Sequence, residues 1–72
     1  MAKTILSVPD ISCVHCERTI TDALSPVEGV RSVRVDIPAK EVHVEYDESR
    51  VDIDRIRGVL GDEEYPVESV IG

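Results

Sequence analysis

Two short stretches near the centre of the chain alternate between apolar and polar residues with a period of two. The first is VRVDI (33–37) and the second is VHVEY (42–46), and both lie within the segment 29–47. This alternation is typical of β-strands that bury one face. The tripeptide PAK (38–40) between them predicts a hairpin. Any fold for this chain must therefore accommodate an antiparallel strand pair at its middle.

The stretch before the hairpin has helical spacing instead. Its apolar residues recur at intervals of three and four, which places them on one face of a helix; they are Ile20, Ala23, Leu24 and Val27. A proline disfavours helical geometry in the residue before it. Because Pro26 follows Ser25, we expect this helix to cover residues 14–25.

A second helix is predicted after the hairpin, over residues 53–61. The same spacing returns there in Ile53, Ile56, Val59 and Leu60. Asp52 is a good N-cap, Asp54 lies in the first turn, and Gly61 is expected to end the helix.

Short strands are expected at both ends, over KTILSV (3–8) and within YPVESVI (65–71). The order strand, helix, strand, strand, helix, strand predicts an α+β fold, the ferredoxin-like βαββαβ sandwich. In this fold a four-stranded antiparallel sheet carries both helices on one face. A length of 72 residues leaves room for one domain, which we expect to cover residues 1–72.

The charge of the chain restricts its partners. Fifteen acidic residues against eight basic ones give a formal net charge of −7. Binding to nucleic acid is not expected, because phosphate contacts require clustered Lys and Arg. The negative charge favours a partner protein with a basic surface. The acidic run Asp62–Glu64 is interpreted as a solvated face.

The beginning of the chain indicates a cytoplasmic protein. The stretch MAKTILSVPD lacks the long apolar run of a secretory signal, and no segment is long enough to cross a membrane. Thiols stay reduced in the cytosol. A disulfide between near neighbours would also close too small a loop to stabilise the fold much, so we do not expect one here.

Cys13 and Cys16 are the two cysteines of the chain. They are placed in the loop after the first strand and in the first turn of the first helix. Unpaired N–H groups and the positive end of the helix dipole favour thiolate over thiol there. Thiolates select soft ions such as Cu(I), and they also bind zinc.

Several functions for this pair remain open. A structural zinc site usually has four protein ligands, whereas the chain offers two Cys and two His; Cu(I) accepts two sulfurs. A dithiol oxidoreductase is another reading of Cys-x-x-Cys near a βαβ unit, with Pro66 as the facing proline. The short chain, the hairpin and the lack of an aromatic residue beside the pair disfavour it. A binding module with no metal role is the third alternative.

The sequence DISCVHC after an N-terminal strand, in a βαββαβ chain of this length, resembles the heavy-metal-associated domain of copper chaperones and copper-transporting P-type ATPases. The resemblance extends from Lys3 to about Ile71. It implies that Cys13 and Cys16 are the metal ligands. The family motif is Gly-Met-x-Cys-x-x-Cys, and this chain departs from it with Asp10 for Gly and Ile11 for Met.

The resemblance also implies roles for neighbouring residues. Ile11 would keep the apolar plug beneath the metal loop, and Ser12 before the first ligand resembles copper-handling members. Tyr65 is predicted to lie beside the metal, the alternative being a ring that caps the core. His15 is either a solvent-facing residue or a third ligand in a dimer that shares copper. His43 is expected to be exposed.

By this resemblance the chain is a soluble copper(I) chaperone, not an enzyme. It would hold one Cu(I) ion, with Zn(II) or Ag(I) as alternatives, and pass it by ligand exchange to a copper-transporting P-type ATPase or its metal-binding domains. A metal-bridged homodimer is possible, and the protein is not embedded in a membrane. Because the chain runs from Met1 to Gly72 without linkers, we expect a free chaperone, the alternative being a domain excised from a transporter.

Overall fold

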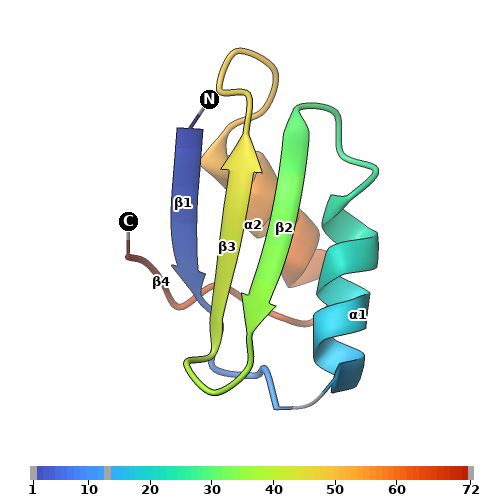
Figure 1. The fold of residues 1–72 in the computed structure, drawn as a ribbon, viewed down its shortest axis with the longest axis vertical. Coiled ribbons are helices and arrows are strands. Elements are labelled where there is room, and N and C mark those ends of the chain that lie inside the picture. The colour runs from blue at the N-terminus through green and yellow to red at the C-terminus, as the bar shows by residue number, and fades with distance from the viewer. Residues whose placement is uncertain (1, 13, 72) are drawn as a thin grey trace.

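The six expected elements occur in the expected order. The computed structural model describes residues 2–12 and 14–71. Figure 1 shows its elements, which are β1 (Ala2–Ser7), α1 (Val14–Leu24), β2 (Val30–Asp36), β3 (Glu41–Tyr46), α2 (Ile53–Asp62) and β4 (Ser69–Val70). The predicted α+β βαββαβ fold is therefore confirmed.

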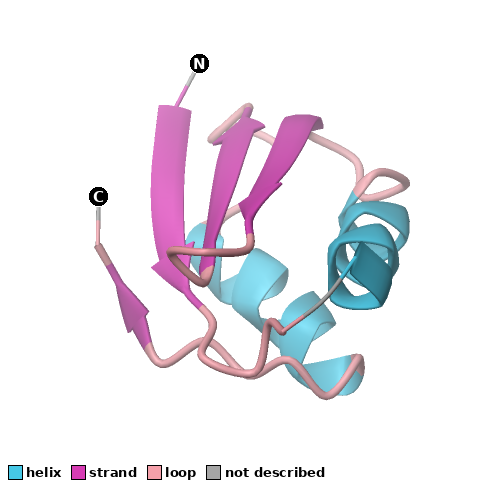
Figure 2. Cartoon of the chain, turned by 60° about the horizontal axis from the view of Figure 1, so that its bottom comes forward, coloured by secondary structure: helices cyan, strands magenta, loops and turns pink. Residues whose placement is uncertain are grey.

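The strands form one antiparallel sheet in the order β2-β3-β1-β4. Both helices lie on one side of this sheet, as Figure 2 shows. The register aligns the apolar positions of neighbouring strands, because Val42 of β3 stands opposite Leu6 of β1 and Val35 of β2. Every second residue of each central strand therefore faces the helices.

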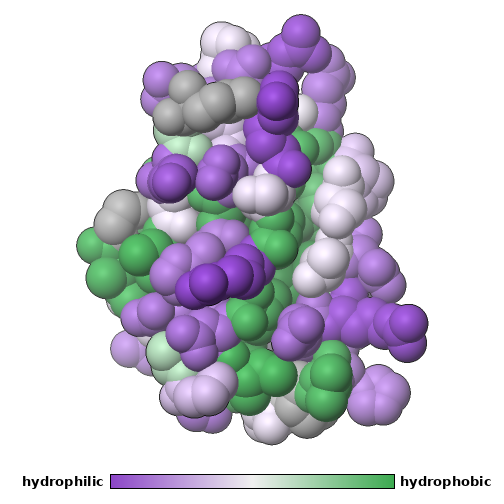
Figure 3. All heavy atoms as spheres, in the orientation of Figure 1, coloured by the Kyte–Doolittle hydropathy of each residue, from purple (hydrophilic) through white to green (hydrophobic). Residues whose placement is uncertain are grey.

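The core fills the space between the sheet and the two helices. Fully buried apolar side chains come from β1, the loop after it, both helices and β3; among them are Leu6, Ile11, Ile20, Val42, Ile56 and Leu60. The other face of the sheet is turned to solvent. Figure 3 looks onto that face and shows hydrophilic side chains spread over it with apolar ones between them.

The ends of two elements differ from the sequence prediction. Gly61 does not end the second helix, which continues to Asp62 and is followed by Glu64 with a φ of 67°. The backbone N–H of Tyr65 donates to the carbonyl of Leu60 over 2.9 Å. The helix therefore ends one residue later than predicted. The same contact occupies the N–H of Tyr65, which a longer β4 would need for pairing in the sheet. The strand β4 covers Ser69–Val70.

His43 was expected to be exposed, and this prediction is wrong. Its side chain is 31% exposed. The strand that carries it lies between β1 and β2, so Ile5 and Arg34 stand opposite His43 on its two sides. Neighbours on both sides cover a residue of a central strand even on the solvent face of a sheet.

Candidate metal centre

The loop between β1 and α1 lies at the end of the molecule where the β2–β3 hairpin turns (Figure 1). We call residues 8–13 the β1–α1 loop. The N–H of Val8 donates to the carbonyl of Lys40 in the hairpin over 2.9 Å, and the N–H of Ile11 donates to the carbonyl of Val8 over 3.2 Å. These bonds attach the loop to the sheet before the chain enters α1.

Cys16 is the third residue of α1, and its side chain is 6% exposed. The hydroxyl of Tyr65 donates to Sγ of Cys16 over 3.2 Å. The sulfur also lies 3.9 Å from Oγ of Ser12 and donates as a thiol to the carbonyl of Asp10 over 3.9 Å. The sulfur thus sits at the first turn of a helix, among polar groups of the loop that precedes it.

Cys13, the other predicted ligand, lies outside the described residues. Its pairing with Cys16 on one ion therefore stays a prediction from the sequence.

Ile11 is fully buried and belongs to the same core cluster as Cys16. Its apolar side chain anchors the loop in the interior, where the family resemblance placed a methionine. The carbonyl of Ile11 accepts a hydrogen bond of 2.8 Å from Nζ of Lys40. The sequence analysis missed Lys40, because nothing in the local pattern shows that a hairpin residue reaches a loop 29 positions away.

Tyr65 is distant from Cys16 in the sequence but contacts it in the structure. It follows α2, it is half-buried, and its ring packs against the core cluster. Its hydroxyl meanwhile reaches the cysteine sulfur. The two readings of Tyr65 are therefore compatible in geometry, since the ring lies against the core and its polar end faces Cys16.

His15 and Asp10 have exposed side chains in this region. His15 precedes Cys16 on α1, so its side chain points away from the buried face that holds the sulfur. Val14 beside it is an apolar residue that is 70% exposed. The exposed surface of the loop and of the first turn of α1 thus combines a histidine, an aspartate and an apolar side chain.

The arrangement suits a soft metal ion. A sulfur at the first turn of a helix is close to N–H groups that have no partner within the helix, and these favour its ionised form. The Lys40 ammonium group adds positive charge at the carbonyl of Ile11. Thiolates prefer soft ions over hard ones.

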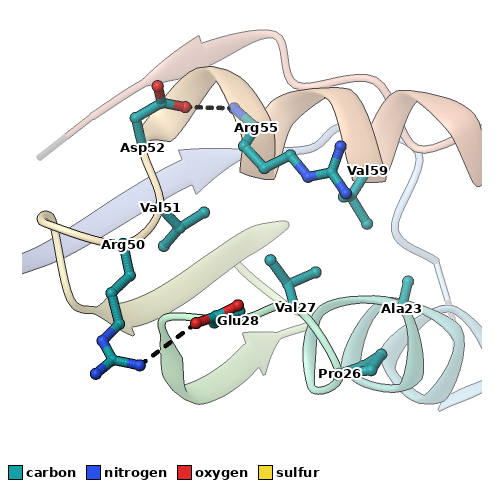
Figure 4. A pocket seen from close by; sticks show the side chains of 9 residues that line it. All are labelled: Ala23, Pro26, Val27, Glu28, Arg50, Val51, Asp52, Arg55 and Val59. Atoms are coloured by element: carbon teal, nitrogen blue, oxygen red, sulfur yellow. Dashed lines mark hydrogen bonds and ion pairs between the residues drawn. The ribbon is translucent and has the colours of Figure 1, made fainter.

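A hollow lies between the end of α1 and the beginning of α2, at the end of the molecule opposite to the β1–α1 loop. It has a volume of about 540 Å³ and is drawn in Figure 4. Arg50 and Glu28 form an ion pair of 3.4 Å at its edge, and its lining contains no sulfur. The hollow offers no ligand for a soft ion, so the thiol end remains the candidate site.

Comparisons with known proteins give consistent results. The family model described as heavy-metal-associated domain matches residues 5–66. The protein named copper chaperone CopZ of Staphylococcus haemolyticus is 34% identical over 67 residues, which are 93% of this chain and 98% of that protein. Neither helix of the described part of the chain is long and apolar enough to cross a membrane.

Two solved structures extend the likeness. The structure titled CopZ metallochaperone superposes with a TM-score of 0.89 at 33% identity and covers 92% of this chain and 98% of its own. The yeast copper transporter domain CCC2A, solved in apo and Cu(I)-loaded states, gives a TM-score of 0.86 at 28% identity. It covers 94% of this chain and 93% of its own.

Proposed function

The chain belongs to the heavy-metal-associated domain family, and from that premise we propose that it is a copper(I) chaperone that holds one ion between Cys13 and Cys16. The observation that carries this proposal is the Cys16 sulfur, which is buried at the first turn of α1 and accepts a hydrogen bond from Tyr65. The relative named as a copper chaperone supports the identity of the ion.

The chemistry of the site favours Cu(I) over a hard ion. Two thiolates satisfy Cu(I), which is soft and accepts low coordination numbers, while a closed zinc site needs four ligands. The helix N-terminus and Lys40 offset part of the negative charge of a bis-thiolate complex. Zn(II) and Ag(I) are the competing ions, because both also bind sulfur.

Delivery to a partner follows by ligand exchange. A cysteine of the partner attacks the bound ion and gives a three-coordinate intermediate, after which one thiolate of this chain leaves. No electron is transferred in these exchange steps. The partner is a copper-transporting P-type ATPase or its metal-binding domains, and the exchange takes place in the cytoplasm. The fold shared with a copper transporter domain supports a partner of the same architecture.

A metal-binding domain within a transporter is the second candidate, since the same yeast domain favours it equally. In either case residues 1–72 act as one heavy-metal-associated domain. A third ligand from exposed His15 would allow two copies to share copper as a homodimer.

Anaerobic titration with Cu(I) against a competing chelator tests the proposal. The wild-type chain should bind one tight equivalent, and Cys13→Ser and Cys16→Ser should each abolish tight binding. Val14→Ala is the matched control, because exposed Val14 lies in the same turn of α1 and carries no ligand atom. Equal binding by the wild type and both serine variants would refute the proposal. Repeating the titration with Zn(II) and Ag(I) ranks the ions.

A disulfide-reduction assay separates the carrier from a dithiol oxidoreductase. A carrier should reduce a model disulfide no faster than free dithiothreitol at the same thiol concentration. Turnover well above that rate, lost in both serine variants, would assign the thiols to redox catalysis instead.

A further inference from the structure

Three side chains with metal-binding atoms meet on the solvent face of the sheet, at the edge where the hairpin turns. They are Asp36 of β2, and Glu41 and His43 of β3. One ligand atom from each lies within 4.8 Å of the other two. The cluster is on the face turned away from the helices, whereas Cys16 belongs to the core between sheet and helices. It is therefore separate from the thiol site.

The register of the hairpin creates this cluster. Asp36 stands directly opposite Glu41, and Glu41 and His43 are two positions apart on one strand, so all three point to the same face. Like charges directly opposite each other on a sheet face are destabilising. Asp36 is further fixed by the N–H of Ala39, which donates to its Oδ1 over 3.3 Å. A cation between the two carboxylates would remove the repulsion.

A ring nitrogen of His43 lies close to one of the two carboxylates. Nε2 of His43 is buried, and it has no hydrogen-bond partner among the described residues. Oε1 of Glu41 lies 3.3 Å from it, but the two atoms are not aligned for a hydrogen bond. Two ligands bound to one tetrahedral zinc ion at about 2.0 Å are about 3.3 Å apart. The spacing between these atoms thus already matches that of two ligands sharing one ion.

We propose that Asp36, Glu41 and His43 form a second metal site, which takes a divalent transition ion of the zinc type. One imidazole nitrogen with two carboxylates suits zinc and its neighbours, while Cu(I) prefers sulfur and magnesium or calcium prefer oxygen alone. The three protein ligands leave a coordination position for water. The chain would then carry two sites that select different ions, one soft and one borderline.

Arg34 is the competing cation on this face. It stands opposite His43 on β2 and is exposed. Its guanidinium group could neutralise the carboxylates in place of a metal ion. Arg34→Ala removes this competitor, so the variant should bind zinc at least as tightly as its parent. Weaker zinc binding by this variant would contradict the metal site.

Zinc titration of the full chain carrying Cys13→Ser and Cys16→Ser tests the proposal, because the thiols can then not compete for the ion. Binding is measured by competition with a fluorescent zinc indicator, and the ring signals of both histidines are followed by NMR. We expect one equivalent that shifts His43 saturably and leaves His15 unmoved. His43→Ala and Glu41→Gln should each weaken binding by about tenfold or more, and the backbone spectrum verifies that each variant is folded.

Three further results would overturn the proposal. They are the absence of a saturable His43 shift, equal zinc affinity of Glu41→Gln and its parent, and loss of binding in the control variant His15→Ala. Because the thiols are absent from this experiment, its failure leaves the copper proposal untouched, and failure of the copper titration leaves this site untouched.

Discussion

The hydroxyl of Tyr65 and the sulfur of Cys16 are 3.2 Å apart although 49 positions separate them in the sequence. A hydrogen bond to sulfur withdraws charge from it, which stabilises the thiolate and weakens its hold on a proton or a competing electrophile. The bond is partly buried, and this limits competition from water. A single side chain from the second half of the chain thus completes the environment of the Cys16 sulfur.

Tyr65→Phe should slow the release of Cu(I) from the chain, because a sulfur that has lost its hydrogen bond is a stronger donor to the ion. The variant keeps the ring against the core but removes the donor to Sγ, a loss of about 1 kcal/mol, which corresponds to about a fivefold change in rate. Stopped-flow transfer of Cu(I) to a chelator measures it. Tyr46→Phe is the matched control, because Tyr46 lies at the other end of β3, opposite Ala2. Unchanged release from Tyr65→Phe would contradict a role for the hydroxyl.

Among the elements, α2 begins at a side-chain cap and ends at backbone hydrogen bonds from the residues that follow it. Oδ1 of Asp52 accepts a hydrogen bond of 2.8 Å from the N–H of Arg55, as the N-cap assignment predicted. The end at Asp62 depends instead on Glu63 and Tyr65, whose N–H groups both bond to the carbonyl of Leu60. Because Tyr65 then contacts Cys16, the position of this helix end matters for the metal centre.

Asp52→Ala should destabilise the protein by about 1 kcal/mol, because an N-cap side chain satisfies a helix N–H that has no other partner. For a chain of this size the melting temperature should fall by about 4–8 °C. Urea and thermal unfolding followed by circular dichroism measure the change. Asp52→Asn keeps the acceptor and should cost much less. A full loss in the asparagine variant would mean that charge rather than capping is responsible.

On the scale of the whole molecule, Ile11 joins the metal loop to the core. It is as completely buried as Leu6, Ile20 and Ile56. Core packing is dense, so removing even one methyl group from such a position is felt by its neighbours. The carbonyl of the same residue is bound by Lys40. We therefore expect changes in core packing at Ile11 to affect the β1–α1 loop.

Ile11→Val should lower both the free energy of unfolding and the affinity for Cu(I). The loss of one buried methylene typically costs about 0.5–1.5 kcal/mol. Ile56→Val is the matched control, because Ile56 is equally buried but belongs to α2. Urea unfolding should show similar losses for the two variants, while chelator competition should show weaker copper binding for Ile11→Val alone. Equal copper affinities would show that the loop is independent of core packing.

The sequence by itself determined the order and type of the elements, because hydrophobic periodicity is a local property of the chain. Spacing of two predicted β2 and β3, spacing of three and four predicted α1 and α2, and Asp52 was correctly identified as an N-cap. The sequence also identified Cys13 and Cys16 as candidate ligands, since they are the two cysteines of the chain. Loop and terminal boundaries were less accurate, as Gly61 and the short β4 show.

Only the tertiary structure decided which distant residues meet. The approach of Tyr65 to Cys16, the bond from Lys40 to Ile11, and the gathering of Asp36, Glu41 and His43 all depend on the sheet register and on the packing of the helices. The partial burial of His43 has the same origin, because β3 lies between β1 and β2 in the sheet. Such contacts arise from pairing between segments far apart in the chain, and no local pattern of residue types contains them.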